Sequence, residues 1–400
     1  MIKNSGTKFY QTFQRPTMLY RCKLFILIIF LSANALAWTA APPQPSKTVL
    51  VTGGAGYIGS QTCKALRQAG YLPIAYDNLS NGYREQVQWG PLEVGDISDQ
   101  EKLKAVIAQY HPIAVIHFAA LKSVGESVKD PAKYYFNNVY GSLVLLDTLK
   151  EMEIRNVIFS STASVYGIPE KPIITENNPV QPINPYGHTK AMVEQIMKDF
   201  EKAYGIHYIS LRYFNAAGAD IDGEIGERGS KPINLIPIAL RVAAKQQKTL
   251  AIFGTDFDTP DGTAIRDYIH VADLADAHVK ALQYLLDGGP SAIMNLGTGK
   301  GSSVNEVVSE VKQISQRLLP TELAPRREGD PPRLVADAKK ANELLNWRPK
   351  HSSLKTIITT EWNWLCKLYR DSLKNQDSDK EGPQNLHLVG NGHSSQARPD

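Results

Sequence analysis

The first half of the chain alternates short apolar runs with stretches of helical spacing. The runs are Thr48–Val51, Leu72–Tyr76, Ile113–Phe118, Asn156–Ser160 and His207–Arg212. A helical pattern separates the first two runs, and a longer one spans about residues 131–152. Short apolar strands that alternate with helices build a parallel sheet covered by helices on both faces. The pattern therefore predicts an α/β fold with a doubly wound parallel sheet.

A glycine-rich turn directly follows the first run and opens the first helix. Gly53, Gly56 and Gly59 recur at every third position. Glycine permits a tight turn and a close approach of the backbone to a pyrophosphate, and the helix N-terminus supplies free N–H groups. Asp77 ends the second run, where a carboxylate accepts hydrogen bonds from an adenosine ribose and repels a 2′-phosphate. These features predict bound NAD rather than NADP. Asp96 is either an adenine contact or a surface turn residue, and both interpretations stay open.

The alternation weakens after residue 215, which divides the expected fold in two. Loops rich in Gly, Pro and Asp occupy 220–232 and 254–262. We expect a Rossmann-type NAD-binding domain over 47–215, to which later segments return. A smaller α/β lobe over 216–372 would then be mainly substrate-binding. The polar segment 373–400 has little apolar material to bury and is predicted to be disordered.

The N-terminal segment 1–46 does not resemble the rest of the chain. Arg21 and Lys23 precede eight apolar residues, Leu24–Leu31, and small residues follow at Ala35–Ala37. This layout is typical of a secretory signal. A membrane anchor is disfavoured because a span needs about 20 apolar residues. The alternative is a mis-called start that leaves an unstructured leader.

The composition excludes several classes of protein. Hydrophobic residues make up 42% and charged residues 21%, as in ordinary soluble enzymes rather than disordered or many-span membrane chains. The net charge of +4 comes from five basic residues in 1–46, which leave 39 basic and 40 acidic residues elsewhere. Nucleic-acid binding therefore gets no support. Three cysteines and no Cys/His cluster suggest neither a disulfide framework nor zinc, and we expect no metal.

A tyrosine and a lysine stand four residues apart at the start of a predicted helix. Tyr186 and Lys190 follow Pro185, and the i,i+4 spacing places them on one helix face. A phenol has a pKa near 10, and a neighbouring ammonium makes its phenolate more accessible as a base. The hydroxyl run that ends at Thr162 would orient a sugar hydroxyl. The alternatives are a solvated helix face for the pair and a capped strand exit for the hydroxyls.

In these and other motifs the chain resembles the extended short-chain dehydrogenase/reductase family, and within it the UDP-glucose (UDP-galactose) 4-epimerases. The resemblance covers nearly all of residues 47–368. It is carried by the runs LVTGGAGYIGS, YDNLSNG, VIHFAALKSVGES, YYFNNVYGS, FSSTASVYG, NPYGHTK, LRYFNAAGA, FGTDFDTPDGTAIRDYIHVADLADAHV, NLGTGKG and APRREGD. It implies NAD-dependent 4-epimerisation of a UDP-hexose through a transient 4-keto intermediate, with NAD as a bound prosthetic group.

The resemblance also implies roles for individual residues. Thr162, Tyr186 and Lys190 match the catalytic hydroxyl, base and lysine. The positions that match NAD contacts are Tyr57, Ile58, Asp77, Asn78, Asp96, Ile97, Phe118, Lys122, Asn137, Tyr186, Lys190 and Tyr213. The positions that match substrate contacts are Thr162, Tyr186, Asn215, Asn234, Arg266, Arg327 and Asp330. The two arginines suit a diphosphate, because a guanidinium pairs with two phosphate oxygens.

Several alternatives stay open. A sugar-nucleotide 4,6-dehydratase would need an Asp-Glu pair after Thr162, where Ala163 and Ser164 stand instead. A 4-epimerase of UDP-xylose/UDP-arabinose or of UDP-N-acetylhexosamines is harder to separate. Leu334 occupies the position of the family's size gate and is intermediate in volume. A catalytically dead NAD-binding protein would be expected to lack the base or the lysine.

We expect a homodimer in the cytoplasm, where NAD and UDP-sugars are abundant. Membrane contact is expected only if the apolar N-terminal segment is retained.

Overall fold

The computed structural model describes residues 47–229, 232–327 and 330–380, with side chains described up to residue 369. The predicted leader 1–46 and the last part of the predicted tail, 381–400, lie outside the described residues.

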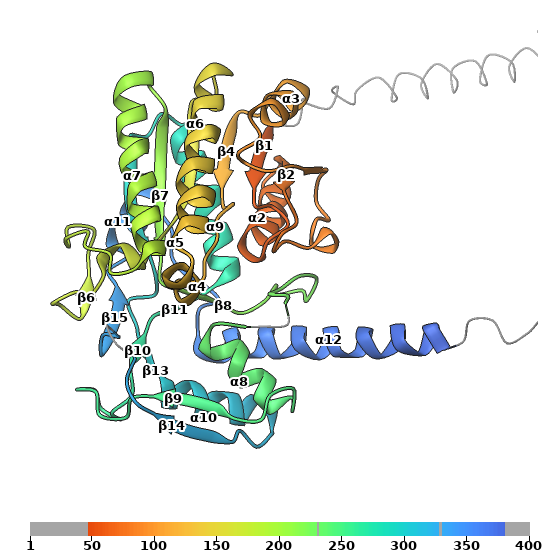
Figure 1. The fold of residues 1–400 in the computed structure, drawn as a ribbon, viewed down its shortest axis with the longest axis vertical. Coiled ribbons are helices and arrows are strands. Elements are labelled where there is room, and N and C mark those ends of the chain that lie inside the picture. The colour runs from red at the N-terminus through yellow and green to blue at the C-terminus, as the bar shows by residue number, and fades with distance from the viewer. Residues whose placement is uncertain (1–46, 230–231, 328–329, 381–400) are drawn as a thin grey trace, which may run out of the picture. The chain divides into compact units, whose positions relative to one another are not determined.

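A parallel sheet of seven strands forms the centre of the fold (Figure 1). Its strands, in spatial order, are β12 (Ala292–Leu296), β7 (His207–Tyr213), β5 (Asn156–Thr162), β4 (Ala114–His117), β1 (Thr48–Thr52), β2 (Leu72–Asp77) and β3 (Leu92–Val94). The five strands expected from the apolar runs are all present, and the predicted α/β fold is confirmed. The last strand, β12, comes from beyond residue 215 and pairs in parallel with β7.

Helices cover both faces of this sheet. On one face lie α2 (Tyr57–Gln68) and α9 (Val271–Leu286), and on the other lie α3 (Gln100–Tyr110), α6 (Gly141–Glu151) and α7 (Pro185–Tyr204). Strand β1 shows why both faces are covered. Val49 and Val51 pack into the core on the α2 side, and Leu50 between them packs into the other core. Alternate side chains of a strand point to opposite faces, so a strand that is apolar throughout needs a core on each side.

The order of the strands predicts a crevice beside β1. The chain passes from β1 to β2 and β3 and then crosses back to β4 on the other side of β1. Ligands of open α/β sheets bind outside the carboxyl ends of the strands at such a switch point. The loops that leave β1 and β4 at their carboxyl ends are therefore where a site is expected.

A smaller part of the fold is built on short strands and three helices. The helices are α8 (Leu235–Ala243), α10 (Val304–Ser315) and α12 (Leu354–Lys380), and they share one apolar core that includes Leu240, Val311 and Ile357. The short strands are β6 (Ile173–Ile174), β8 (Asn215–Ala217), β9 (Leu250–Phe253), β10 (Ile265–Arg266), β11 (Tyr268–His270), β13 (Ser302–Ser303), β14 (Thr321–Ala324) and β15 (Arg333–Ala336). They form a four-stranded sheet, β13-β10-β15-β6, and two pairs, β11-β8 and β14-β9.

The remaining elements connect these layers. They are η1 (Arg84–Gln86), α4 (Val124–Lys129), α5 (Pro131–Tyr134), η2 (Tyr135–Tyr140), η3 (Ala163–Tyr166) and α11 (Lys339–Leu345). Of these, η2 is a turn of π-helix that joins α5 to α6.

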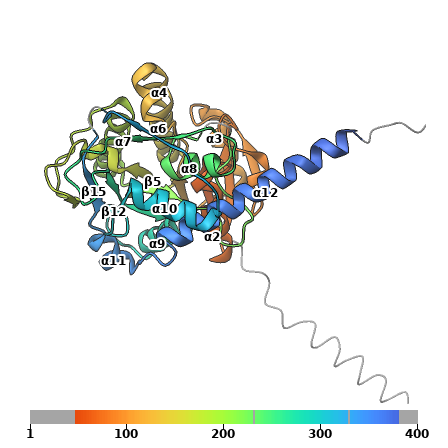
Figure 2. The same ribbon diagram turned by 90° about the horizontal axis from the view of Figure 1, so that it is seen from below.

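Helix α12 runs beyond the boundary that we predicted at residue 372. The helix continues to Lys380, so the prediction of disorder is wrong for 373–380. Figure 2 shows the end of α12 extending away from the body of the molecule. The segment holds no glycine or proline before Gly382 and Pro383, and its Leu, Lys and Gln residues are good helix formers. Low apolar content alone therefore did not indicate the end of the helix.

Candidate active site

A cavity of about 810 Å³ lies at the carboxyl ends of β1, β2, β4, β5 and β7. Its wall includes Gly53 after β1, Asp77 at the end of β2, Phe118 after β4, Thr162 at the end of β5 and Tyr213 at the end of β7. The crevice predicted by the strand order and the cavity thus coincide.

The glycine turn after β1 leaves no room for side chains. Gly53 has a φ of +72°, which disfavours other residues, and a Cβ there would lie 2.7 Å from the backbone nitrogen of Ala119. A Cβ on Gly59 would lie 2.1 Å from the carbonyl oxygen of Gly53. Helix α2 starts at Tyr57 with no side-chain cap at Gly56. Its first N–H groups, including those of Tyr57 and Ile58, therefore remain for an anion at the cavity wall.

Asp77 is buried at the end of β2 and organises the loop beside the glycine turn. Its carboxylate accepts hydrogen bonds from the backbone nitrogens of Ala55 at 3.0 Å and Leu79 at 2.8 Å. Burial raises the pKa of Asp77, and these two hydrogen bonds oppose the increase. A carboxylate has about four lone-pair positions, so two remain for ribose hydroxyls.

Asp96 lies one step further from the cavity than we expected. Asn78 and Ile97 line the cavity, whereas Asp96 is not among the described residues of the lining. Its Oδ2 accepts from Asn78 Nδ2 at 2.8 Å, and its Oδ1 accepts from the backbone nitrogen of Ser98 at 2.9 Å. Burial opposes its ionisation, but the bonds from Ser98 and Asn78 prevail and lower the pKa of Asp96. In this structure Asp96 orients Asn78 and its own turn.

The loop after β4 is fixed by an asparagine that the sequence did not single out. Asn138 is buried and bonds both backbone groups of Leu121, accepting from its nitrogen at 2.8 Å and donating to its oxygen at 3.0 Å. It also donates to Thr189 Oγ1 on α7 at 3.1 Å. The neighbouring Asn137 lines the cavity, as does Lys122 from the loop itself. The π-helical turn η2 thus ties this loop to α7.

Thr162, Tyr186 and Lys190 come together at the cavity wall. Helix α7 begins at Pro185, because Asn184 caps it by accepting from the nitrogen of Gly187 at 2.8 Å. This start places Tyr186 and Lys190 on the face toward β5. Lys190 donates to the carbonyl oxygen of Ser160 at 2.7 Å, and its ammonium lies 4.7 Å from the centroid of the Phe159 ring. All three predicted residues line the same cavity.

The site changes the acidity of both ionisable groups. Burial raises the pKa of Tyr186, and a hydrogen bond with Thr162 acts in the opposite direction. Burial lowers the pKa of Lys190 to about 7, against an opposing effect of Glu194. Burial thus moves the two pKa values in opposite directions, because it favours the neutral phenol and the neutral amine alike.

The expected substrate residues are divided between the cavity and its surroundings. Asn215, Asn234 and the gate position Leu334 line the cavity. Arg266, Arg327 and Asp330 are not among the described lining residues. Arg266 forms an ion pair with Asp330, and the guanidinium of Arg327 lies 3.9 Å from the centroid of the Phe253 ring.

Comparison with known proteins identifies the family. Residues 49–297 match the NAD dependent epimerase/dehydratase family. The chain belongs to this family. UDP-glucose 4-epimerase of Rhizobium leguminosarum bv. trifolii is 49% identical over 321 residues, which cover 80% of this chain and 98% of that protein. UDP-glucose 4-epimerase from Brucella ovis in complex with NAD is 50% identical with a TM-score of 0.78, covering 79% of this chain and 97% of that chain. UDP-glucose 4-epimerase from Bifidobacterium longum in complex with NAD+ and UDP is 40% identical with a TM-score of 0.75, covering 80% and 98%.

The residues fit the NAD of this family. The turn after β1 is packed so closely that a Cβ at Gly53 or Gly59 would meet backbone atoms, which brings its N–H groups to the cavity wall. The free N–H groups at the start of α2 suit the pyrophosphate, and the carboxylate of Asp77 suits a ribose. The predicted family, fold and cofactor are therefore confirmed.

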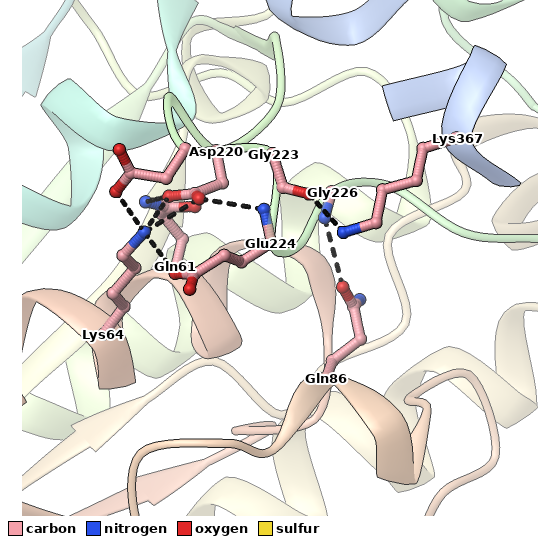
Figure 3. A network of polar contacts seen from close by, with 9 residues as sticks. Gln61, Lys64, Gln86, Asp220, Gly223, Glu224, Gly226 and Lys367 are labelled. Carbon is pink, nitrogen blue, oxygen red and sulfur yellow. Dashed lines mark hydrogen bonds and ion pairs between the residues drawn. The ribbon is translucent and has the colours of Figure 1, made fainter. Parts of the chain in front are cut away.

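A buried lysine joins helix α2 of the epimerase fold to the segment after β8. Lys64 forms ion pairs with Asp220, Asp222 and Glu224 at 2.8, 2.7 and 2.7 Å (Figure 3). The three carboxylates lie close enough to hold a cation. The ammonium of Lys64 bonds to each of them, so we assign the cluster to anchoring this segment.

Two further contacts anchor the same segment, one at Gly223 between these carboxylates and one at Gly226 beyond them. Gln86 accepts from the nitrogen of Gly226 at 3.2 Å, and Lys367 of α12 donates to the carbonyl of Gly223 at 2.7 Å (Figure 3). Glu227, which follows Gly226, lines the cavity and forms an ion pair with Lys122 at 2.8 Å.

Glu361 is a second cavity residue that the sequence did not indicate. It lies on α12, is 5% exposed, and accepts from the nitrogen of Gly218 at 3.0 Å. Neither Glu361 nor Glu227 belongs to a motif, and the contact of Glu361 spans more than a hundred residues of sequence. No pattern in the chain could have placed either of them at the cavity.

No helix in the part of the chain that the structure describes has the length and apolarity needed to cross a membrane.

Proposed function

We propose that the protein interconverts UDP-glucose and UDP-galactose by NAD-dependent epimerisation at C4, through a transient 4-keto sugar. One observation carries the proposal: Thr162, Tyr186 and Lys190 share one cavity with the glycine turn and Asp77. A base, a hydroxyl and a cofactor cradle are thus combined within reach of one sugar. The similarity to UDP-glucose 4-epimerases supports the choice of UDP-hexose.

The chain's own residues supply proton transfer and orientation. Tyr186 takes the proton from the O4 hydroxyl of the sugar and returns it at the end of the cycle. Thr162 bonds the same hydroxyl and the phenol, which fixes the direction of transfer. Lys190 stabilises the phenolate through its positive charge. Bound NAD supplies a hydride acceptor for C4 that gives the hydride back within the same cycle.

Recognition of the UDP group is assigned to residues around the cavity. Asn215 and Asn234 line the cavity and can bond to sugar or phosphate oxygens. Arg266 and Arg327 would pair with the diphosphate, for which Arg266 must exchange its bond to Asp330 for one to phosphate.

Elimination of water is disfavoured by the residues that follow Thr162. Ala163 and Ser164 continue into η3, and neither carries a group that acts as a general acid or base. Epimerisation needs no second acid at this point, whereas a 4,6-dehydratase does.

The proposal is tested by incubating purified protein with UDP-galactose, without added NAD, and analysing the products. We expect UDP-glucose to form, and acid-released nucleotide from the same preparation to contain NAD(H). A product that has lost water from the sugar would show dehydratase activity instead of epimerisation. An absence of reaction after NAD has been added would contradict it.

We also propose that the protein is a homodimer in the cytoplasm. Phe136, Tyr140 and Leu143 are spaced along one side of η2 and α6, and they are 71%, 52% and 40% exposed. An exposed apolar row of this kind suits a second copy of the chain. The cytoplasm supplies both NAD and UDP-sugars.

A further inference from the structure

A buried ion pair lies behind the candidate catalytic residues. Glu194 of α7 and Arg212 of β7 are each no more than 3% exposed. Arg212 Nη2 bonds Glu194 Oε2 at 2.6 Å, and Arg212 Nε bonds Glu194 Oε1 at 2.9 Å. Two charges in this setting lose much hydration, and the pair needs further hydrogen bonds to be maintained.

The structure supplies those bonds from β5, which carries Thr162, and from η3, which follows it. Ser161 donates to Glu194 Oε1 at 2.6 Å, and Arg212 Nη1 bonds Tyr166 Oη at 2.8 Å. Tyr166 in turn donates to Asn295 Oδ1 at 2.7 Å. The carboxylate of Glu194 is thus held in one position by donors from β5 and β7.

The pair is in register with the candidate site. Strands β5 and β7 are neighbours, and Ser161 is paired with Arg212 one step before Thr162 is paired with Tyr213. On α7, Glu194 follows Lys190 by one helical turn, so both lie on the face toward the sheet.

We infer that Glu194 is a positioning residue for the proposed reaction: its carboxylate, fixed by Arg212 and Ser161, keeps the ammonium of Lys190 charged at the cavity wall. The inference rests on the proposed function, which requires a charged lysine beside Tyr186. An uncharged lysine would still bond the carbonyl of Ser160, but it would not stabilise a phenolate.

Glu194 supplies the negative charge beside Lys190, because the imidazole, hydroxyls and phenols around the lysine are neutral near pH 7. Strand β4 presents His117, whose pKa burial lowers to about 3, so the imidazole is neutral near pH 7. Strand β5 presents hydroxyls, the ring of Phe159 and the carbonyl of Ser160.

The other neighbours do not replace this charge. Strand β7 presents Tyr213, whose pKa is raised by burial, and Arg212, which is bonded to Glu194. Helix α7 itself presents Tyr186, and η3 presents Tyr166, whose pKa burial raises to about 12. The effect of Glu194 on Lys190 opposes burial, which by itself lowers the pKa of the lysine.

The test compares two variants that break the same ion pair from opposite sides. Glu194→Gln leaves the positive charge of Arg212 without its partner, and Arg212→Gln leaves the negative charge of Glu194. Both weaken the fold, but they change the field at Lys190 in opposite directions. A purely structural role would affect them alike.

Two readouts follow the charge of Lys190. The first is the titration of the Lys190 ¹³Cε resonance in lysine-labelled protein, assigned by its absence in Lys190→Arg. The second is the high-pH limb of kcat/KM for UDP-galactose. We expect Glu194→Gln to lower both the Lys190 pKa and the pH of the high-pH limb by about one unit or more. In Arg212→Gln, both values should lie well above those of Glu194→Gln.

Controls separate the possible outcomes. Asp220→Asn breaks a buried ion pair elsewhere in the fold, that of Lys64, and should leave the Lys190 titration unchanged. If Glu194→Gln does not fold, the double variant Glu194→Gln/Arg212→Gln removes both charges and should titrate below wild type. The inference is overturned if the two single variants titrate alike, or if neither Glu194→Gln nor the double variant lowers the pKa. Wild-type protein without epimerase activity would instead overturn the proposed function.

Discussion

The buried surroundings of Tyr186 disfavour its phenolate form. Burial favours the neutral phenol and raises its pKa, whereas the hydrogen bond with Thr162 favours the phenolate. We expect Tyr186→Phe to lower epimerase activity by about 100- to 10,000-fold, the usual effect of losing a general base. Bound NAD, measured after acid release, should be retained. The matched control Tyr71→Phe removes a buried hydroxyl that bonds Gln283 and should leave activity near wild type. More than half of the activity in Tyr186→Phe would show that another group is the base.

We propose that Leu334 limits the space available to the sugar. It lines the cavity and packs beside Phe214 and Ala336. Leucine is larger than serine and smaller than tyrosine, so we expect UDP-glucose and UDP-galactose to be preferred and UDP-N-acetylglucosamine to react weakly. Leu334→Ser should raise the N-acetyl activity, and Leu334→Tyr should remove it while sparing the hexoses. The ratio of kcat/KM for the two substrates should change by about 10- to 200-fold. An equal ratio in all three proteins would exclude this residue as the gate.

The residues that sequence could place are those that share a local motif. Gly53, Asp77, Tyr186 and Lys190 were found because a turn, a strand end and a helix turn fix their relative positions. Glu361 was missed because only the tertiary fold brings it to the cavity. The bond between Asp96 and Asn78 depends on two loops meeting, and no spacing in the chain encodes it.

At the scale of elements, the junction of β1 and α2 depends on the absence of a side chain. A Cβ on Gly59 would lie 2.1 Å from the carbonyl oxygen of Gly53, and because this atom is backbone, the turn itself must shift to make room. We expect Gly59→Ala to be purified without NAD and to have a lower Tm. Gly125 lies in helix α4 with nothing within 4 Å of its Cβ position, so Gly125→Ala is the matched control. It should keep its NAD and its Tm. Full occupancy by NAD in Gly59→Ala would contradict the cradle.

The contact between α12 and the segment after β8 should depend on pH. Burial, and then the charge of Glu227, raise the pKa of Glu361 to about 8. In the unfolded chain a glutamate ionises near pH 4.3, so between that pH and 8 the folded state holds a proton that the unfolded state lacks. The contribution of Glu361 to stability is therefore present at low pH and is lost as the pH rises through about 8.

Glu361→Gln cannot titrate and should escape this loss. The free energy of unfolding of each protein is measured by denaturant titration. The difference between Glu361→Gln and wild type should rise in favour of the variant by about 2 kcal/mol or more from pH 5 to pH 9. Glu322→Gln, which makes the same substitution at an exposed glutamate of β14, is the matched control for the substitution itself. A flat difference for Glu361→Gln would show that Glu361 is ionised throughout.

Elements were predictable to the extent that their residues are buried on both faces. The central strands are continuous apolar runs, because each touches two cores, and the sequence revealed them. Strand β3 and the two-residue strands of the smaller sheets are too short to show a period. Helix α12 was cut short because its last turns carry few apolar residues, although nothing in them stops a helix.

At the scale of the whole molecule, one apolar row stays exposed among the residues that the structure describes. Phe136, Tyr140 and Leu143 lie on η2 and α6, the connection that also fixes the loop after β4. If a second copy packs there, assembly and the cofactor loop share one structural element. Light scattering should give wild-type protein twice the mass of one chain, and Phe136→Asp should shift it to the mass of one chain, because a charge cannot be buried there without a partner.

Leu323 on β14 provides a matched control for this assembly. It is 72% exposed against 71% for Phe136, but it lies in the smaller part of the fold. Leu323→Asp should therefore keep the wild-type mass. Since η2 also orders the loop that carries Lys122, Phe136→Asp should hold NAD less tightly than Leu323→Asp does in a dialysis comparison. The proposed dimer contact would be contradicted if Phe136→Asp kept the wild-type mass. It would also be contradicted if the wild-type protein had the mass of one chain.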